Sequence, residues 1–539
     1  MARRGSRGAA EPRRSARFIL GFLRASATPR ATSSNRLVAT LVAAAVLALP
    51  AHAQSTAQRV AAFDAYVAQA AKDWHVPGLA VAVVLNDSVI LAKGYGVREL
   101  GKPGAVDAGT RFAIGSTTKA MTAAALGMLV DEGKLRWDDP VTKLLPDFRL
   151  SDPWVTRELT VRDLLTHRAG LGNADLLWAG ADYPHAEVVR RIRTLPMAYS
   201  MRAGWEYQNI MYAVAGDVVQ AASGMPWQQF VRTRIFGPLG MTATEPTLAA
   251  VTGQPNVASP HGEIGDTLRV IANRPVDPVE SAGSVWSSVG DMAKWMRFVL
   301  DSGRVGGKRL LSERSFRELL TPQTIADRAI YPTIAVLRPH FFTYGFGWFL
   351  HDYQGQAVAM HTGSIDGMSA LIGLIPDRRL GIYVLANADH AELRHALMLT
   401  AFDRFAGTAS TPARDWSAEL LKLYGAQRAR ARAAEREREA RRAADTHPSL
   451  PLARYAGTYS DPTFGDVTVT ESGGALRLRF GRAYDGELAH WQYDTFRARG
   501  ADARAGSSLV TFVPDGRGGV RSLEAFGVSF ARARPGAAP

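Results

Sequence analysis

The sequence predicts an α+β fold: one antiparallel sheet flanked by helices, with an inserted helical region, followed by a separate C-terminal all-β, barrel-like domain. Two observations carry this prediction. Strand-like runs lie at 79–95 and again at 344–386, with helix-like segments between them, so both ends of one domain are expected to close a common sheet. Beyond residue 450 the pattern consists only of strands and turns, as in a small barrel or sandwich.

The composition is that of a globular protein with a sizeable core. The chain has 539 residues, 47% hydrophobic and 21% charged, which is enough for two or three domains. It contains no cysteine. A disulfide framework, a thiol nucleophile and a cysteine-ligated metal are therefore excluded.

The first segment, residues 1–53, has the pattern of a secretory signal peptide. An apolar run at 37–49 follows Arg36 and precedes the residues Pro-Ala-His-Ala at 50–53. A basic region, a short apolar core and an A-x-A end predict cleavage after Ala53. The run is short for a membrane span. We therefore expect a periplasmic or secreted protein with no stable membrane span, and the true translation start stays open.

The net charge of +14 does not predict a nucleic-acid partner. Residues 1–53 hold nine arginines against Glu11 alone, a net charge of +8, which leaves +6 for the rest of the chain. A nucleic-acid-binding surface needs a concentrated basic patch, and none is visible in the sequence.

A hydrolase-like domain is expected over 54–406. It begins with an amphipathic helix at 57–75 and a hairpin whose strands, 79–85 and 89–95, are joined by a turn-forming Asn-Asp-Ser. The elements that follow are expected to be helices at 160–166, 186–195, 211–222 and 226–236, strands at 344–350, 357–361, 369–375 and 380–386, and a helix at 389–405.

A charged helical linker is predicted at 407–447, because 431–442 mixes Arg, Ala and Glu without a large apolar face. The last segment, 448–539, is predicted to be the small β-barrel domain. Its expected strands are 455–459, 466–471, 475–480, 490–497, 508–513 and 522–530.

The main candidate site is a serine followed three residues later by a lysine. Ser116 and Lys119 stand at the start of a predicted helix, ahead of an apolar run at 121–130, and residues three apart lie on one helix face. A serine hydroxyl needs a nearby base, and a buried lysine can serve. Such a motif alone is more often a simple helix cap, but Lys119 is the only lysine with a serine three residues before it.

Two further motifs supply groups that the chemistry needs. Tyr207 and Asn209 belong to the only Tyr-x-Asn in the chain; the phenol is a candidate second proton carrier, and the amide is expected to face a substrate amide. Downstream stand the consecutive residues His361, Thr362, Gly363 and Ser364. Glycine there allows a substrate to lie against the strand, and the Ser364 N–H is expected to complete an oxyanion hole with the Ser116 N–H.

These three motifs, in this order, resemble the penicillin-recognising serine hydrolases: class C β-lactamases, DD-peptidases, D-aminopeptidases and related esterases. The resemblance covers about 60–405 and includes the stretches at 164–171, 235–241 and 344–348, and the tail is similar to a small β domain often appended to such hydrolases. It implies a β-lactamase/transpeptidase-like fold. The stretch around His167 would then stabilise the fold.

The resemblance also implies roles for the motif residues. Ser116 would be the acylated nucleophile, and Lys119 and Tyr207 the base and proton relay. The implied substrate-binding residues are Asn209, His361, Thr362, Gly363 and Ser364. Many β-lactamases and DD-peptidases have lysine where this chain has His361, whose charge depends on its surroundings. The difference favours the peptidase or esterase branch.

The sequence thus predicts an exported serine hydrolase that forms an acyl-enzyme on amide or ester bonds. Its expected substrates are small molecules or peptides, including D-residue and cell-envelope peptides. The enzyme is expected to use no cofactor and no metal. The alternative is a catalytically silent, penicillin-binding-like protein that binds or scaffolds the cell envelope. A metallohydrolase and an α/β-hydrolase are disfavoured, since neither H-E-x-x-H nor G-x-S-x-G occurs. The oligomeric state stays open.

Overall fold

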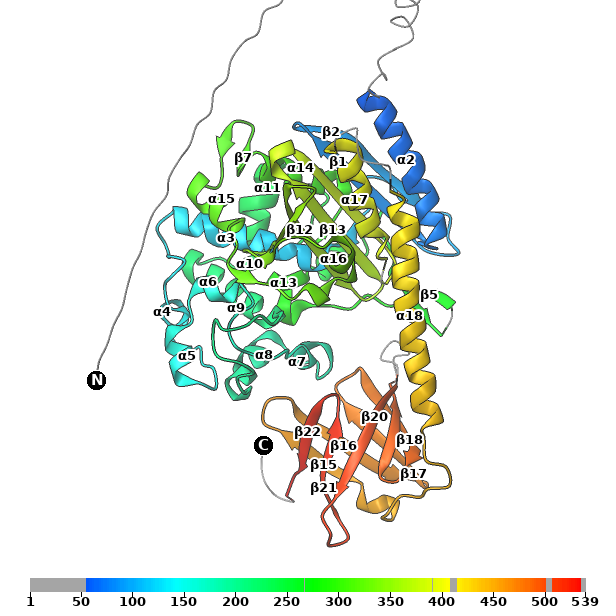
Figure 1. Ribbon diagram of the computed structural model, residues 1–539. Helices are drawn as coiled ribbons and strands as arrows, with labels where there is room; N and C mark the ends of the chain where they lie inside the picture. Colours follow the sequence, from blue (N-terminus) through cyan, green and yellow to red (C-terminus); the bar gives the residue numbers. More distant parts are fainter. Residues whose placement is uncertain (1–54, 266, 390, 408–413, 501–506, 535–539) are drawn as a thin grey trace, which may run out of the picture. The chain divides into compact units, whose positions relative to one another are not determined.

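An eight-stranded sheet organises the hydrolase-like domain in the computed structural model (Figure 1). Its strands, in spatial order, are β2 (Ser88–Gly96), β1 (Gly78–Leu85), β14 (Leu380–Ala386), β13 (Met368–Ile375), β12 (Gln356–Ile365), β11 (Phe349–Tyr353), β10 (Phe342–Tyr344) and β9 (Thr324–Ile325). All neighbouring pairs are antiparallel. Because β1 pairs with β14, the first and last strands of the domain meet in one sheet, as predicted.

The structure describes residues 55–539 apart from 266, 390, 408–413, 501–506 and 535–539. The predicted signal peptide at 1–53 lies outside these residues. None of the helices within the described ranges combines the length and the apolar character that a membrane crossing requires.

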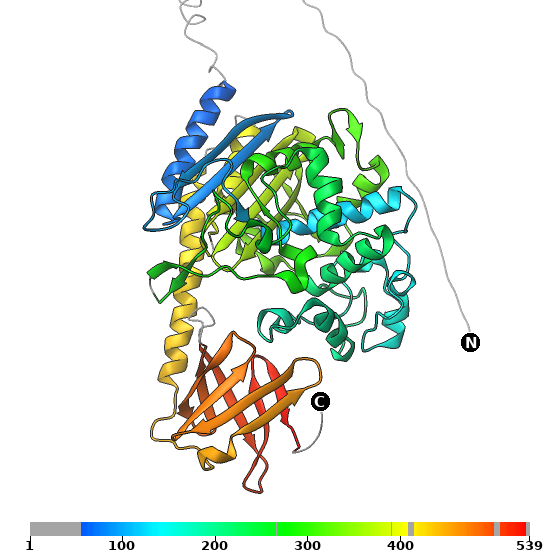
Figure 2. The same cartoon turned by 180° about the vertical axis from the view of Figure 1, so that it is seen from behind.

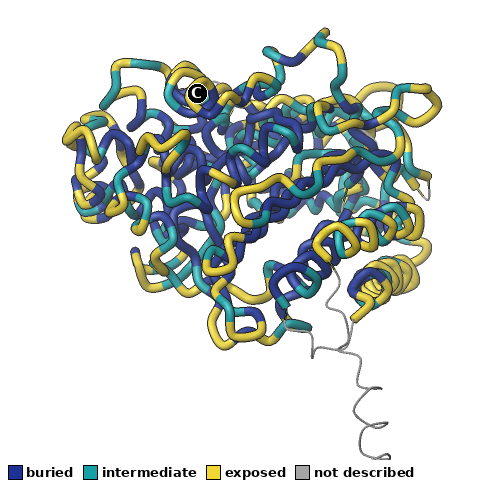
Figure 3. Tube along the Cα trace, turned by 90° about the horizontal axis from the view of Figure 1, so that it is seen from above, coloured by how far each residue is buried: buried dark blue, intermediate teal, exposed yellow. Residues whose placement is uncertain are grey.

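Both faces of the sheet are buried, because successive side chains along a strand point to opposite faces. In β1, Ala80 and Ala82 belong to one hydrophobic core, whereas Leu79 and Val81 belong to the other. A sheet covered on both sides needs strands that are apolar at nearly every position, and this explains the continuous apolar runs that predicted β1 and β14. Figure 3 shows the buried residues gathered in the interior and the exposed ones on the outer turns.

One face of the sheet is covered by α2 (Thr56–Asp73), α17 (Leu393–Phe405), the first turns of α18 (Trp416–Ala440) and the short helix α16 (Pro332–Leu337), which contributes Ile334 to this core. Figure 2 shows α2 alongside the β1–β2 hairpin. Trp416 and Leu420 of α18 are fully buried in this core, whereas 425–440 is almost entirely exposed. The predicted linker therefore begins as part of the hydrolase core and becomes a solvated helix only afterwards.

The opposite face carries the helical region. Its longer helices are α3 (Thr118–Asp131), α9 (Asn209–Ser223) and α14 (Val289–Leu300). The shorter ones are α4 (Val141–Leu144), α5 (Pro153–Glu158), α6 (Val161–Leu164), α7 (Leu176–Ala179), α8 (His185–Arg191), α10 (Trp227–Val231), α11 (Gly237–Leu239), α12 (Leu248–Val251), α13 (Glu280–Gly283) and α15 (Glu313–Leu319). Small two-stranded sheets are also present: β3 (Phe112–Ala113) pairs with the distant β6 (Trp286–Ser287), whereas β4 (His261–Ile264) with β5 (Thr267–Val270) and β7 (Arg304–Val305) with β8 (Lys308–Arg309) form hairpins.

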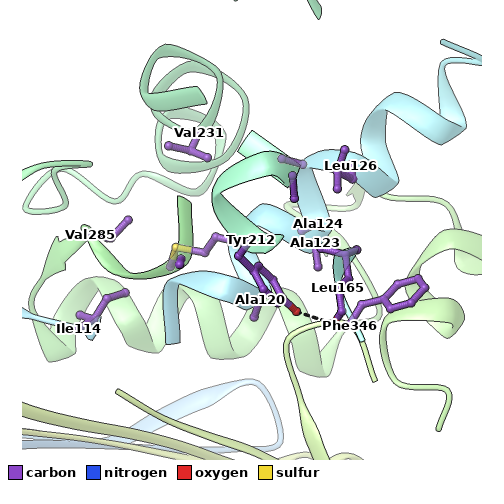
Figure 4. Packing of buried hydrophobic residues seen from close by; sticks show 14 of the residues in the cluster. Ile114, Ala120, Ala123, Ala124, Leu126, Leu165, Tyr212, Val231, Val285 and Phe346 are labelled. Carbon is purple, nitrogen blue, oxygen red and sulfur yellow. Dashed lines mark hydrogen bonds between the residues drawn. The ribbon is translucent and has the colours of Figure 1, made fainter. Parts of the chain in front are cut away.

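The packing of α3 against α9 fixes the helix that begins just after Ser116. Figure 4 shows Ala120, Ala123 and Ala124 of α3 close to Tyr212 of α9. Small side chains allow two helices to approach closely in a dense core. The Tyr212 hydroxyl donates a 2.8 Å hydrogen bond to the Leu165 carbonyl, so this buried phenol is satisfied.

The C-terminal domain is a closed eight-stranded barrel, which confirms the predicted all-β domain. Its strands are β15 (Gly457–Asp461), β16 (Gly465–Ser472), β17 (Ala475–Phe480), β18 (Tyr484–Gln492), β19 (Thr495–Arg499), β20 (Ser507–Pro514), β21 (Val520–Ala525) and β22 (Val528–Arg532). The prediction of one strand at 490–497 was wrong, because Tyr493 adopts a left-handed turn conformation (φ 47°) that ends β18 before β19 begins. The interior is filled by packed aromatic rings, among them Tyr455, Phe496 and Phe512.

Candidate active site

Ser116 lies in a single 3-10 turn, Gly115–Thr117, directly before α3. The Thr117 hydroxyl donates to the Ile114 carbonyl at 2.9 Å and lies 2.6 Å from the Tyr383 hydroxyl of β14, which ties the turn to the sheet. Ser116 itself is half-buried, whereas its neighbours on both sides are buried. The turn thus holds the Ser116 hydroxyl at a fixed place with access to solvent.

Two glycines bring the Ser116 turn against strand β12. Gly115 has a left-handed backbone (φ +52°), and a Cβ atom there would lie 2.6 Å from Ser364 N. A Cβ atom on Gly363 would lie 1.9 Å from Ile114 O and 3.0 Å from Ser116 N. Only glycine fits either position. The close approach sets the backbone N–H groups of Ser116 and Ser364 near each other, as an oxyanion hole requires.

Strand β12 is longer than the predicted run at 357–361. It continues to Ile365 because 361–365 pairs with 368–372 of β13. The predicted His361–Ser364 segment is therefore in the second half of a strand, where β13 is its one partner among the described strands.

Lys119 is fully buried, and its amine has three acceptors. Nζ donates to Ser116 Oγ at 3.0 Å, to Asn209 Oδ1 at 2.7 Å and to the Ala282 carbonyl at 3.0 Å. Burial lowers the pKa of Lys119 to about 7, although the negative charge of Asp175 opposes this shift. Burial disfavours the charged form of an amine. A substantial fraction of Lys119 is consequently neutral near pH 7, and a neutral amine can accept a proton.

Tyr207 stands on the extended segment that leads into α9, and its ring centroid is 4.8 Å from Lys119 Nζ. Burial raises the pKa of the Tyr207 phenol well above its usual value, and a hydrogen bond with the Ser116 side chain partly offsets this rise. The phenol therefore stays protonated at neutral pH. The structure thus brings together the three residues predicted to be catalytic, Ser116, Lys119 and Tyr207.

Asn209 connects Lys119 to a carboxylate that no motif indicated. Its Oδ1 accepts from Lys119, and its Nδ2 donates to Asp175 Oδ2 at 2.9 Å. The other carboxylate oxygen of Asp175 accepts from Trp178 Nε1 at 2.8 Å. These partners fix which way the Asn209 amide faces, and Asp175 uses one of its two N–H hydrogens.

His167 holds the segment that carries Tyr207. Its Nδ1 accepts from the Gln208 N–H at 3.0 Å, and its carbonyl accepts from the Glu206 N–H at 2.9 Å. The His167 and Tyr207 ring centroids are 4.3 Å apart. Burial lowers the pKa of His167 well below its usual value, so the ring is neutral. The residue also has a left-handed backbone (φ 57°), which is unusual for a side chain of this size.

The side chains of His361 and Thr362 face protein partners. His361 Nε2 accepts from the Tyr344 hydroxyl at 3.0 Å, and Nδ1 donates to the Thr362 carbonyl at 2.6 Å. Burial lowers the pKa of His361 to about 3. The Thr362 hydroxyl lies 2.7 Å from the Tyr331 hydroxyl. Of the four predicted residues in this segment, Ser364 is exposed, whereas His361, Thr362 and Gly363 are buried.

Sequence reasoning missed Asp175 because it belongs to no motif and lies in the irregular part of the helical region. In the ranges that the structure describes, no three or more His, Cys, Asp or Glu side chains are grouped to hold a metal ion.

The mixed fold, with its helical region and separate barrel, is that of the β-lactamases and transpeptidases. The chain belongs to the Beta-lactamase family, whose profile matches residues 63–402. A second profile, "Domain of unknown function (DUF3471)", matches residues 441–534 and therefore covers the barrel.

Curated relatives include proteins named as hydrolases. The chain is 31% identical over 435 residues to "Unguisins hydrolase ungD" of Aspergillus violaceofuscus (strain CBS 115571), covering 75% of each chain. It is 26% identical over 321 residues to "Protein flp" of Staphylococcus aureus (strain COL), covering 58% of this chain and 60% of that one.

Solved structures show the same fold at low sequence identity. The octameric penicillin-binding protein homologue from Pyrococcus abyssi superposes with a TM-score of 0.55 at 21% identity, covering 88% of this chain and 100% of the other. SurE gives a TM-score of 0.53 at 21% identity, covering 88% and 99%.

Proposed function

We propose that this chain is a serine hydrolase that cleaves amide or ester bonds through an acyl-enzyme formed on Ser116. One observation carries the proposal: a fully buried lysine, with its pKa lowered to about 7, lies 3.0 Å from the Ser116 hydroxyl. Lysines are rarely buried without a specific role. A lysine in this state is suited to act as a general base at neutral pH.

The first step is attack on the substrate carbonyl. Neutral Lys119 takes the proton from Ser116 Oγ, which bonds to the carbonyl carbon while the carbonyl π electrons move to the oxygen. The N–H groups of Ser116 and Ser364 donate to the resulting oxyanion, and backbone donors arranged in advance are an effective way to stabilise such a charge. The free N–H of Asn209 holds the adjoining amide of the substrate.

The second step expels the leaving group. The oxyanion electrons re-form the carbonyl, the bond to the amine or alcohol breaks, and Tyr207 gives its proton to the departing atom. The proton held by Lys119 then returns to Tyr207. Water next attacks the ester on Ser116 by the same proton transfers, which releases the acid and restores the serine. The protonated phenol at neutral pH supports Tyr207 as this proton donor.

The proposed substrates are peptide amides, including peptides with D-residues, or esters. His361 is neutral and engaged by Tyr344, so the position provides no cation for a substrate carboxylate. The similarity to a relative named "Unguisins hydrolase" supports a hydrolytic activity. We also propose that residues 1–53 direct export. The N-terminal residue of the exported protein should then be Gln54.

Intact-mass measurement after exposure to a labelled penicillin and an activated ester tests the proposal. The unaltered protein should gain the mass of one acyl group, and Ser116→Ala should gain none. Ser88→Ala, at the exposed first residue of β2, should react like the unaltered protein. A stable adduct with no turnover of a panel of peptides and esters would favour the silent binding protein. Absence of any adduct at Ser116 overturns the proposal.

A further inference from the structure

We infer that Arg394 is a positioning residue for the oxyanion hole: its guanidinium fixes and polarises the peptide group between Gly363 and Ser364, whose N–H faces the Ser116 turn. The inference rests on the proposed function, because an oxyanion hole matters only if Ser116 is acylated. No motif pointed to Arg394, which is the second residue of α17 and lies more than 270 residues beyond Ser116 in the chain.

The Arg394 side chain is almost completely buried (5% exposed) and ends on strand β12. Its Nη1 donates to the Gly363 carbonyl at 2.7 Å, to Ser364 Oγ at 2.9 Å and to the Ala370 carbonyl of β13 at 3.2 Å. One guanidinium nitrogen therefore contacts both strands at the point where β12 touches the Ser116 turn.

The Gly363 carbonyl and the Ser364 N–H belong to the same peptide group. In a trans peptide these two bonds point in opposite directions. Because the carbonyl is turned toward Arg394, the N–H is turned away from it. The position of Ser364 N agrees, since it is the atom that a Cβ on Gly115 would meet first, at 2.6 Å. A hydrogen bond that orients the carbonyl thus orients the proposed oxyanion donor as well.

The charge of Arg394 is neutralised within the protein. Nη2 donates to Glu392 Oε1 at 3.1 Å, and Glu392 Oε2 lies 3.0 Å from His395 Nδ1. Burial alone would raise the pKa of Glu392, but Arg394 and His395 hold that pKa well below its usual range. The carboxylate therefore stays ionised beside the guanidinium. Arg394 is committed to this ion pair and to backbone carbonyls, which distinguishes it from a residue that binds a substrate carboxylate.

A cation on the carbonyl oxygen also strengthens the N–H as a donor. Charge-assisted hydrogen bonds are stronger than neutral ones, and successive hydrogen bonds polarise one another. The effect increases as negative charge develops on the substrate oxygen. Loss of Arg394 should accordingly slow acylation while leaving ground-state binding nearly unchanged.

The test compares an activated oxygen ester with the thionoester that differs from it only in the carbonyl atom. An oxyanion hole is shaped for oxygen, so a protein with an intact oxyanion hole should be acylated much faster by the oxygen ester than by the thionoester. In Arg394→Met/Glu392→Gln, which removes both buried charges together, we expect oxygen-ester acylation to fall ten- to a hundredfold with little change in KM. The thionoester rate should change much less, so the ratio of the two rates should fall at least tenfold.

Arg394→Lys keeps the cation, so its ratio of oxygen-ester to thionoester rates should lie between those of the unaltered protein and the double variant. This single variant keeps the inference testable if the double variant does not fold. The matched control is Arg532→Met in the barrel, because Arg532 likewise donates to two backbone carbonyls, those of Arg454 and Ala456. It should leave both rates unchanged. An unchanged ratio in folded Arg394 variants overturns this inference alone. Failure of the unaltered protein to form any adduct at Ser116 overturns the proposed function and, with it, the inference.

Discussion

The amine of Lys119 lies closer to Asn209 Oδ1, at 2.7 Å, than to Ser116 Oγ, at 3.0 Å. Asn209 in turn donates to Asp175, so a continuous chain of hydrogen bonds runs from the serine to a half-buried carboxylate. Such a chain fixes the direction of each partner. The position and the charge of the candidate base therefore depend on a residue in a distant loop.

The first prediction concerns Asp175→Asn. The negative charge of Asp175 raises the pKa of Lys119 against the effect of burial, so its removal should lower that pKa. The acidic limb of the acylation pH profile should then move to lower pH, and the maximal rate should fall because Asn209 is held less firmly. Stopped-flow acylation across pH 5–9 measures both effects. Asp327→Asn, at an exposed position, is the control, and an equal shift in that variant would contradict this explanation.

The second prediction concerns the pH dependence of the unaltered protein. Attack requires neutral Lys119, so the acylation rate should rise with pH through an apparent pKa of about 7 and then level off. His361, with its pKa lowered to about 3, stays neutral between pH 5 and 9 and cannot cause this rise in the acylation rate. Lys119→Arg should lose roughly a thousandfold or more in rate, because arginine does not give up its proton. A flat profile between pH 5 and 9 would exclude Lys119 as the base.

The third prediction concerns the contact between Gly363 and the Ser116 turn. A methyl group at Gly363 meets Ile114 O at 1.9 Å, so Gly363→Ala must push β12 away from the turn. We expect a loss of about 1–3 kcal/mol in unfolding free energy and a loss of acylation well beyond what this destabilisation explains. Gly133→Ala is the control: its positive φ (+71°), which Gly363 lacks, makes alanine unfavourable there, but nothing lies near the added Cβ. It should lose stability only.

The fourth prediction concerns the start of α18. Trp416 is 0% exposed within the hydrolase core, so Trp416→Ala should cost about 3–5 kcal/mol in a urea titration. Trp154→Ala removes a tryptophan that is 51% exposed and should cost far less. A small loss for Trp416→Ala would mean that α18 does not belong to the hydrolase core.

Several features follow from the sequence because they depend on local periodicity. Successive side chains of β1 and β14 enter hydrophobic cores on opposite faces of the sheet, so both strands are apolar along their whole length. Helical spacing alone places Lys119 one turn from Ser116. The glycine at 363 was expected to allow a substrate to lie against the strand, and the structure shows that the Ser116 turn also approaches it closely. By contrast, the turn at Tyr493 was missed, since it depends on one residue adopting a left-handed conformation.

The sequence by itself determined the fold class, the barrel and the residues proposed to perform acyl transfer, because each depends on a short-range pattern. Only the tertiary structure decided the protonation states and the supporting contacts. Burial lowers the pKa of Lys119, and the hydroxyl of Tyr344 engages His361. Asp175 and Arg394 come from segments distant from Ser116, and no local pattern links them to it. Desolvation and long-range contacts arise only when the chain is folded. The sequence therefore predicted the motif residues but neither their protonation states nor their distant partners.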